Sequence, residues 1–279
     1  MNIAVVGLGL IGGSFAKATK QKTLHNVYGY DTDDEVQLFA RLTGAIDAKL
    51  TDEILTECDL VIVALLPGAA VKWIEGKKNV LGKGKCTVID ICGVKRNICK
   101  VLSQCAKKNN FNYIGGHPMA GKEIGGFVNS SEDLFENASM ILTPTEKYDI
   151  KFLESIQNYF LDIGFSNITF ATPEEHDRVI AFTSQLAHIV SGAYVKSPTA
   201  KQQRGFSAGS FKDMTRVARL DENMWTELMM ENKDYLAQEL RIVIDNLKEY
   251  LDALETKDSQ ALCKCLKEGK IAKAQAGGN

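Results

Sequence analysis

Residues 2–20, NIAVVGLGLIGGSFAKATK, set the architecture of the N-terminal half of the chain. The stretch opens on a short apolar run, Asn2 to Val6, which is typical of a buried strand. Gly7, Gly9 and Gly12 then form a G-x-G-x-x-G pattern, and a stretch of helical character follows. Because the glycines join a strand directly to a helix, the stretch predicts the first strand–turn–helix unit of a doubly wound sheet.

Apolar runs farther along the chain continue this alternation of strands and helices. The expected strands lie at residues 27–30, 59–65, 87–91, 140–143 and 167–170. The expected helices between them lie at residues 33–42, 95–107 and 149–162. Strands that alternate with helices at this spacing indicate a parallel sheet with helices on both faces.

The pattern changes after Thr172, where "TPEEH" begins a helix with Thr172 as N-cap and Pro173 in the first turn. From there the chain is almost entirely helix-periodic. The predicted fold class is an α/β Rossmann-type doubly wound parallel sheet followed by an all-α C-terminal domain. Residues 1–168 are expected to form the dinucleotide-binding domain, and residues 169–279 a helical domain for substrate binding and dimerisation.

The dimer is expected because apolar residues recur near helical spacing between Met224 and Leu251. They include Trp225, Leu228, Met229, Leu236, Leu240, Ile244 and Leu247. Such a stripe needs a partner surface, which a two-fold axis between identical chains can supply. The sequence therefore predicts a homodimer.

Composition excludes several classes of protein. The 33 basic and 35 acidic side chains leave a net charge of -2, so nothing favours nucleic acid or an anionic membrane as a partner. The sequence lacks an apolar run long enough to span a membrane. Its seven scattered cysteines are odd in number, which favours a reducing, cytoplasmic location. The pair Cys263 and Cys265 has no further ligands nearby, so no metal site is expected.

The glycine motif predicts a dinucleotide cofactor. Gly7 permits the tight turn, Gly9 lets the pyrophosphate approach the backbone, and Gly12 allows close packing of helix and strand. Asp31 ends the second strand, where its carboxylate can accept hydrogen bonds from ribose hydroxyls and would repel a 2′-phosphate. NAD is therefore favoured over NADP. The expected cofactor-binding residues are Gly7, Leu8, Gly9, Leu10, Ile11, Gly12 and Asp31.

Three segments carry candidate groups for the chemistry. His117 lies in "YIGGHPMAG", where three glycines and a proline predict an irregular loop, and histidine is the usual general base near neutral pH. His188 lies in an apolar helical stretch, where a buried structural histidine is the commoner interpretation. Arg216 follows Lys212 and Asp213 in "GSFKDMTRVARLDENMW", which fits either a solvated charged helix or a site that grips a carboxylate.

These segments together resemble the prephenate dehydrogenase family, the NAD-linked enzymes of tyrosine biosynthesis. The resemblance covers nearly the whole chain. It rests on the G-x-G-x-x-G motif, "DICGVK" at 90–95, "GGHPMAG" at 115–121, "EEHD…SQLAH" at 174–188 and "FKDMTRVA" at 211–218.

The resemblance implies the reaction and the residue roles. Prephenate, which carries two carboxylates, would lose hydride from C4 to NAD+ and then CO2, giving 4-hydroxyphenylpyruvate. His117 would accept the C4-hydroxyl proton, Arg216 would pair with a substrate carboxylate, and His188 would contact the substrate. Glu123 matches a family acid near the mouth of the site. Lys212, Asp213 and Trp225 would support the pocket.

One departure and several alternatives stay open. Family members often have serine where this chain has Gly93, and that serine shares the C4 hydroxyl, so here a backbone N–H, a water or Cys92 would have to take over.

Arogenate, which bears an amine in place of the keto group, is an alternative substrate. A redox-sensing NAD-binding protein without turnover is a second alternative, although a sensor needs no proton acceptor such as His117. A 3-hydroxyacid dehydrogenase is a third, but the lysine motif of that class is missing.

Overall fold

The computed structural model describes residues 1–84, 86–122 and 124–277. Its N-terminal part is built on a sheet with the strand order β3-β2-β1-β4-β5-β6-β7-β8. The strands are β1 (Asn2–Val6), β2 (Asn26–Tyr30), β3 (Ala48–Lys49), β4 (Leu60–Val63), β5 (Thr87–Asp90), β6 (Asn112–Pro118), β7 (Ser139–Pro144) and β8 (Asn167–Phe170). All neighbours pair in parallel except β6 and β7, which are antiparallel. The doubly wound, mainly parallel sheet expected from the sequence is confirmed.

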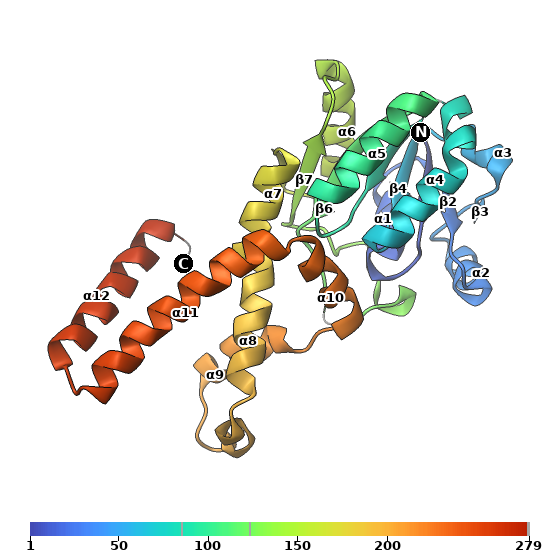
Figure 1. Ribbon diagram of the computed structural model, residues 1–279. Coiled ribbons are helices and arrows are strands. Elements are labelled where there is room, and N and C mark those ends of the chain that lie inside the picture. The colour runs from blue at the N-terminus through green and yellow to red at the C-terminus, as the bar shows by residue number, and fades with distance from the viewer. Residues whose placement is uncertain (85, 123, 278–279) are drawn as a thin grey trace.

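Helices cover both faces of this sheet (Figure 1). They are α1 (Leu10–Lys22), α2 (Asp34–Leu42), α3 (Asp52–Leu55), α4 (Pro67–Gly84), α5 (Arg96–Asn109) and α6 (Ile150–Asp162). One apolar core joins one face of the sheet to α1, α2 and α6 through side chains such as Phe15 and Phe160. A second core joins the other face to α3, α4 and α5 through side chains such as Ile74 and Leu102.

The sequence analysis predicts no helix at the position of α4, whose several glycines lower helical propensity. One of them, Gly82, is required by packing: a Cβ there would lie 1.9 Å from the carbonyl oxygen of Asn109 at the end of α5. The contact between the two helices therefore compensates for the weak local preference.

The prediction of an irregular loop around His117 is wrong, because His117 belongs to β6 and pairs with Ile141 of β7. The glycines beside it serve packing within the sheet. A Cβ at Gly115 would lie 2.3 Å from Thr143 Oγ1, and one at Gly116 would lie 2.6 Å from the Met140 methyl. His117 is therefore held on a rigid strand near its carboxyl end.

The C-terminal part is helical throughout its regular structure, as the sequence predicts. Its elements are α7 (Pro173–Ile180), the π-helical η2 (Ala181–Leu186), α8 (Ala187–Val195), η3 (Pro198–Gln202), α9 (Gly209–Thr215), η4 (Arg216–Ala218), α10 (Glu222–Glu231), α11 (Lys233–Glu255) and α12 (Ser259–Ala276). As expected, the Thr172 hydroxyl caps α7 by accepting from the Glu175 N–H. In Figure 1, α11 and α12 form a hairpin that projects away from the sheet.

The apolar stripe predicted between Met224 and Leu251 is shared between two helices, α10 and α11. Its first half is used within the chain: Leu228 and Leu236 are buried, and Leu236 packs in a small core with Ala181 and Leu186. Its second half is exposed, with Leu247 at 59% and Leu251 at 52% of full exposure. The projecting hairpin thus carries apolar side chains that the described chain does not cover.

Within the described residues, every helix is too short or too polar to cross a membrane.

Candidate active site

The glycine turn connects β1 to α1, and close contacts require glycine at two of its three motif positions. Gly7 has φ of 84°, and a Cβ there would lie 2.4 Å from the Ala64 carbonyl oxygen. A Cβ at Gly12 would lie 1.8 Å from the Gly7 carbonyl oxygen, so only glycine lets the helix start this close to the turn. By contrast, a Cβ at Gly9 would meet no described atom within 4 Å. Gly9 therefore faces open space, which is where a bound group can approach the backbone.

The first turn of α1 is suited to bind an anion. Among the described residues, no side chain caps this helix, whose N-cap is Gly9, so its first N–H groups are left for a ligand. Asp31, directly after β2, braces the turn: Oδ2 accepts from the Leu8 N–H at 2.7 Å, and Oδ1 accepts from the Asp33 N–H at 3.1 Å. These features fit a dinucleotide whose phosphates lie at the helix start and whose ribose lies near a carboxylate.

A cavity of about 880 Å³ opens between this turn and the helical elements. The predicted site residues that line it are Gly9, Leu10, Ile11, Gly12, Gly93, His117, His188 and Arg216. Trp225 and Leu228 of α10 add apolar wall. The fold thus brings residues from the glycine motif, β6, α8 and η4 to one site, although they are far apart in the sequence.

Other predicted residues lie elsewhere. Lys212 and Asp213 are exposed on α9 and do not contribute to the lining of this cavity. Gly7, Leu8 and Asp31 support the turn from behind its cavity surface. Glu123 lies outside the described residues.

His117 presents Nε2 to the cavity beside Gly93, where an ideal Cβ would lie 3.8 Å from that nitrogen. Burial lowers the pKa of His117 well below its ordinary value, and the charges of His176 and Lys95 act in the same direction. The imidazole is therefore neutral near pH 7 and can accept a proton.

His176 lies behind His117, and the sequence patterns predict no role for it. Its Nε2 lies 2.8 Å from His117 Nδ1, and its own Nδ1 lies 2.8 Å from Asp177 Oδ1. His176 and Asp177 are only 2% and 1% exposed. The neighbouring His and Asp in "EEHD" were the signal that could have found them, but only the fold shows that they face His117.

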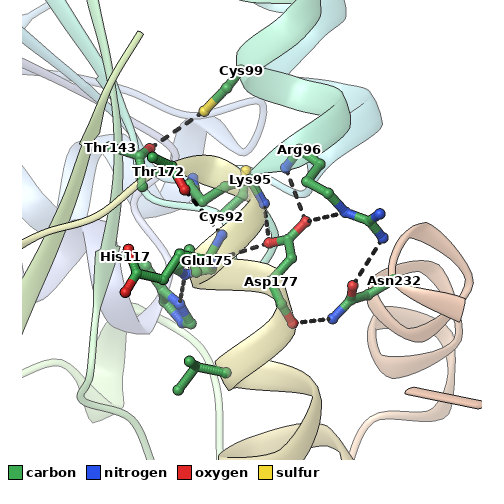
Figure 2. Close-up of polar contacts among 12 residues, drawn as sticks. Cys92, Lys95, Arg96, Cys99, His117, Thr143, Thr172, Glu175, Asp177 and Asn232 are labelled. Carbon is green, nitrogen blue, oxygen red and sulfur yellow. Dashed lines mark hydrogen bonds and ion pairs between the residues drawn. The ribbon is translucent and has the colours of Figure 1, made fainter. Parts of the chain in front are cut away.

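Asp177 is a centre of contacts between the two parts of the chain, as Figure 2 shows. It accepts from the backbone N–H groups of Lys95 at 2.7 Å and Arg96 at 2.9 Å, at the start of α5. Asn232 donates to the Asp177 carbonyl oxygen at 2.8 Å. Although burial alone would raise it, hydrogen bonds from His176 and these backbone groups lower the pKa of Asp177. Asp177 is therefore a carboxylate in the folded protein.

A buried ion pair lies beside this centre. Lys95 and Asp90 are fully buried and bonded to each other, and the Tyr113 hydroxyl donates to Asp90 Oδ2 at 2.6 Å. The pair joins the end of β5 to the start of α5, so it holds the backbone that supports Asp177. Asp90 and Lys95 are the two charged residues of the "DICGVK" segment, and this ion pair explains why both are there.

His188 lies on the helical side of the cavity and contacts the segment that carries Arg216. Its Nδ1 donates to the Val217 carbonyl oxygen at 2.8 Å, and its ring lies 3.9 Å from the Trp225 ring, centroid to centroid. Burial lowers the pKa of His188, with a smaller contribution in the same direction from the charge of Arg216. Nε2 of His188 is left as a neutral acceptor.

Gly93 leaves room where a side chain would fit. The Leu228 methyl groups would lie 3.4 and 3.6 Å from a Cβ at this position, which is ordinary contact. Cys92 does not fill the gap: its thiol donates to the Leu65 carbonyl oxygen at 3.3 Å, and the residue does not line the cavity. Cys92 is thus excluded as the replacement considered from the sequence.

Comparisons with known proteins agree with this geometry. The family model described as "Prephenate dehydrogenase, nucleotide-binding domain" matches residues 15–168, and that described as "Prephenate dehydrogenase, dimerization domain" matches residues 172–268. Cyclohexadienyl dehydrogenase of Zymomonas mobilis is 33% identical over 98% of this chain and 94% of its own length. Prephenate dehydrogenase of Bacillus subtilis is 29% identical over 96% of this chain and 74% of its own length.

A solved structure gives the same result in three dimensions. Prephenate dehydrogenase from A. aeolicus, in complex with hydroxyphenyl propionate and NAD+, superposes with a TM-score of 0.80 at 28% identity. The match covers 99% of this chain and 98% of that one. From its glycine turn to its helical part, this chain therefore belongs to the prephenate dehydrogenase family.

Proposed function

We propose that the protein catalyses the NAD-dependent oxidative decarboxylation of prephenate to 4-hydroxyphenylpyruvate, in tyrosine biosynthesis. One observation carries the proposal: a single cavity is lined by Gly9 and Gly12 of the nucleotide turn, by the neutral base His117 and by the cationic Arg216. Hydride transfer, proton removal and carboxylate binding need these three kinds of group close together.

The cofactor is held by the turn and by the N-terminus of α1. The open space at Gly9 and the N–H groups of the first helical turn would receive the pyrophosphate, and Asp31 would accept hydrogen bonds from the adenosine ribose. When bound, NAD+ supplies the acceptor for the hydride that leaves C4.

His117 removes the proton from the C4 hydroxyl. Nε2 faces the cavity, and the lowered pKa keeps its lone pair available at neutral pH. The substrate O–H bond breaks, an N–H bond forms at Nε2, and a carbonyl develops at C4 as the hydride leaves. Taking the proton in the same step avoids a protonated carbonyl.

Arg216 binds a substrate carboxylate from the opposite wall. A guanidinium can donate two parallel hydrogen bonds to a carboxylate, which gives orientation as well as affinity. Trp225 and Leu228 provide apolar surface against which the substrate ring can pack, and His188 offers Nε2 as an acceptor. Glu123, Lys212 and Asp213 keep the supporting roles that the family resemblance implies.

Arogenate is the second candidate, because Asp221 also lines the cavity and can pair with an amine. The test is NADH formation with prephenate and with arogenate, measured side by side on the same preparation. A kcat/KM for prephenate above that for arogenate supports the proposal. The reverse order assigns the enzyme to arogenate, and no NADH with either compound rejects the reaction.

We propose that residues 1–168 bind the nucleotide. Residues 169–279 bind the substrate and form a homodimer, as the sequence predicts. The exposed apolar side chains of α11 and α12 support dimerisation, as does the match to a family domain named for it. A cytoplasmic location is supported by seven cysteines that are all free thiols.

A further inference from the structure

We propose that His176 and Asp177 are positioning residues that hold His117 in the tautomer with its proton on Nδ1, so that Nε2 is always the proton acceptor. The inference rests on the proposed function, because it concerns the same base. It is carried by two hydrogen bonds of 2.8 Å that join three side chains in a row, His117, His176 and Asp177.

The order of the protons follows from the carboxylate at the end of the row. Asp177 is ionised and can only accept, so His176 must carry its proton on Nδ1. Burial lowers the pKa of His176, so it is neutral and its Nε2 carries a lone pair. That lone pair can only accept, so Nδ1 of His117 must be the donor. The remaining nitrogen, Nε2 of His117, is left unprotonated on the cavity side.

The row is held from several elements. The backbone N–H groups of Lys95 and Arg96 fix the two carboxylate oxygens of Asp177. The Arg96 guanidinium also donates to Asp177 Oδ2 and pairs with Asp234 on α11. Because the start of α5, α7 and α11 all meet here, the carboxylate cannot turn away from His176.

The other titratable or charged groups near His117 come from both sides. The buried pair Lys95 and Asp90 lies on the sheet side, and His188 and Arg216 line the cavity on the helical side. Of these four residues, Lys95 contacts the row through its backbone N–H, which donates to Asp177 Oδ1. When His117 gains the substrate proton, the Asp177 carboxylate stabilises the positive charge. The neutral imidazole of His176 lies between the two groups.

The tautomers can be observed without turnover. The chain has only four histidines, so ¹⁵N labelling of histidine gives a small set of imidazole signals. His117→Asn and His176→Gln identify the two signals of interest by their loss. We expect both imidazoles to carry their proton on Nδ1 at neutral pH. A proton on Nε2 of His117 overturns the proposal, whether or not the protein oxidises prephenate.

Two variants of similar size separate an acceptor from a space-filler. His176→Gln can place an amide oxygen near Nε2 of the original ring and still accept from His117, whereas His176→Phe cannot accept. We expect His176→Phe to lower kcat on the order of 10²-fold, with KM for substrate and Kd for NAD changed less than about 3-fold. His176→Gln should recover most of that loss.

Three outcomes contradict the role of His176 as the hydrogen-bond acceptor for His117. They are equal losses in the two variants, a His176→Phe enzyme that keeps more than about a tenth of the wild-type kcat, and a loss confined to KM. Melting temperatures are measured for both variants, and the wild-type NMR result decides the tautomer if His176→Phe does not fold. A wild-type protein that makes no NADH from prephenate or arogenate rejects the proposed function and leaves the NMR result standing.

Discussion

His188 Nδ1 on α8 donates a hydrogen bond of 2.8 Å to the carbonyl oxygen of Val217, the residue that follows Arg216. One turn farther along α8, the Ser191 hydroxyl donates to the Met214 carbonyl oxygen at 2.7 Å. The segment that carries Arg216 is therefore tied by its backbone to α8. Because the backbone of this segment is held in place, the exposed side chain of Arg216 can still reach the cavity.

Arg216→Ala is expected to weaken use of the substrate and leave NAD binding unchanged. A hydrogen bond between charged groups contributes about 1.5–3 kcal/mol, which corresponds to a loss of about 10- to 150-fold in kcat/KM. The loss should lie mainly in KM, because the carboxylate is bound alike in ground and transition states. Steady-state kinetics check this, with the exposed Arg41→Ala on α2 as the matched control. An unchanged kcat/KM rules out the carboxylate contact.

His117→Asn is expected to lower kcat by about 10²–10⁴-fold, because asparagine cannot take a proton at neutral pH. NAD affinity and the fold should be intact. In the wild type, the lowered pKa of His117 places the acid limb of the kcat profile below about pH 6.5, the ordinary histidine value. If the variant keeps more than about a tenth of kcat with chemistry rate-limiting, another group is the base.

Acidification is expected to destabilise the protein below about pH 6.5. The pKa values of His117 and His176 are lowered in the folded state, so the unfolded chain binds protons there that the folded chain does not. The free energy of unfolding therefore falls as the pH falls from about 6.5 toward the folded-state values.

Urea unfolding at about pH 7.5 and about pH 5.5 measures this loss. In His117→Asn one of the titrating imidazoles is absent, and the loss should be smaller. Equal stability of the wild type at the two pH values contradicts the burial of neutral imidazoles.

Asp31→Asn is expected to shift cofactor preference toward NADP. The amide oxygen can still accept from the Leu8 N–H, while the negative charge that opposes a 2′-phosphate is removed. We expect the ratio of kcat/KM for NAD over NADP to fall at least about tenfold, equivalent to about 1.4 kcal/mol. The wild type should prefer NAD, and an equal or higher value with NADP defeats the role given to Asp31.

Light scattering at micromolar concentration is expected to give twice the mass of one chain. Leu247 and Leu251 on α11 are more than half exposed, so Leu247→Glu with Leu251→Glu should place charges in the interface and yield monomers. Leu24→Glu, at a fully exposed leucine between α1 and β2, is the matched control and should leave the dimer intact. A monomeric wild type contradicts the dimer.

Much of the fold could be predicted because its signals are local. The apolar run of β1, the glycines after it and the Thr172 cap each depend on residues within a few positions of one another. The glycine motif could be interpreted in the same way, since the steric limits at Gly7 and Gly12 arise within the turn and the adjoining end of β4. His117 and Arg216 were found by residue type and motif, without knowledge of their surroundings.

The remaining features depend on contacts between distant segments, which local patterns do not encode. His117 lies on β6 because its glycines meet Thr143 and Met140 across the sheet, while the same residues also fit a loop. His176 sits on a helix 59 positions away, and only the docking of α7 beside β6 makes it the partner of His117. Sequence patterns supplied the chemical groups, because those depend on residue type. Their tautomers, their pKa values and the shared cavity arise from burial and packing, which exist only in the folded chain.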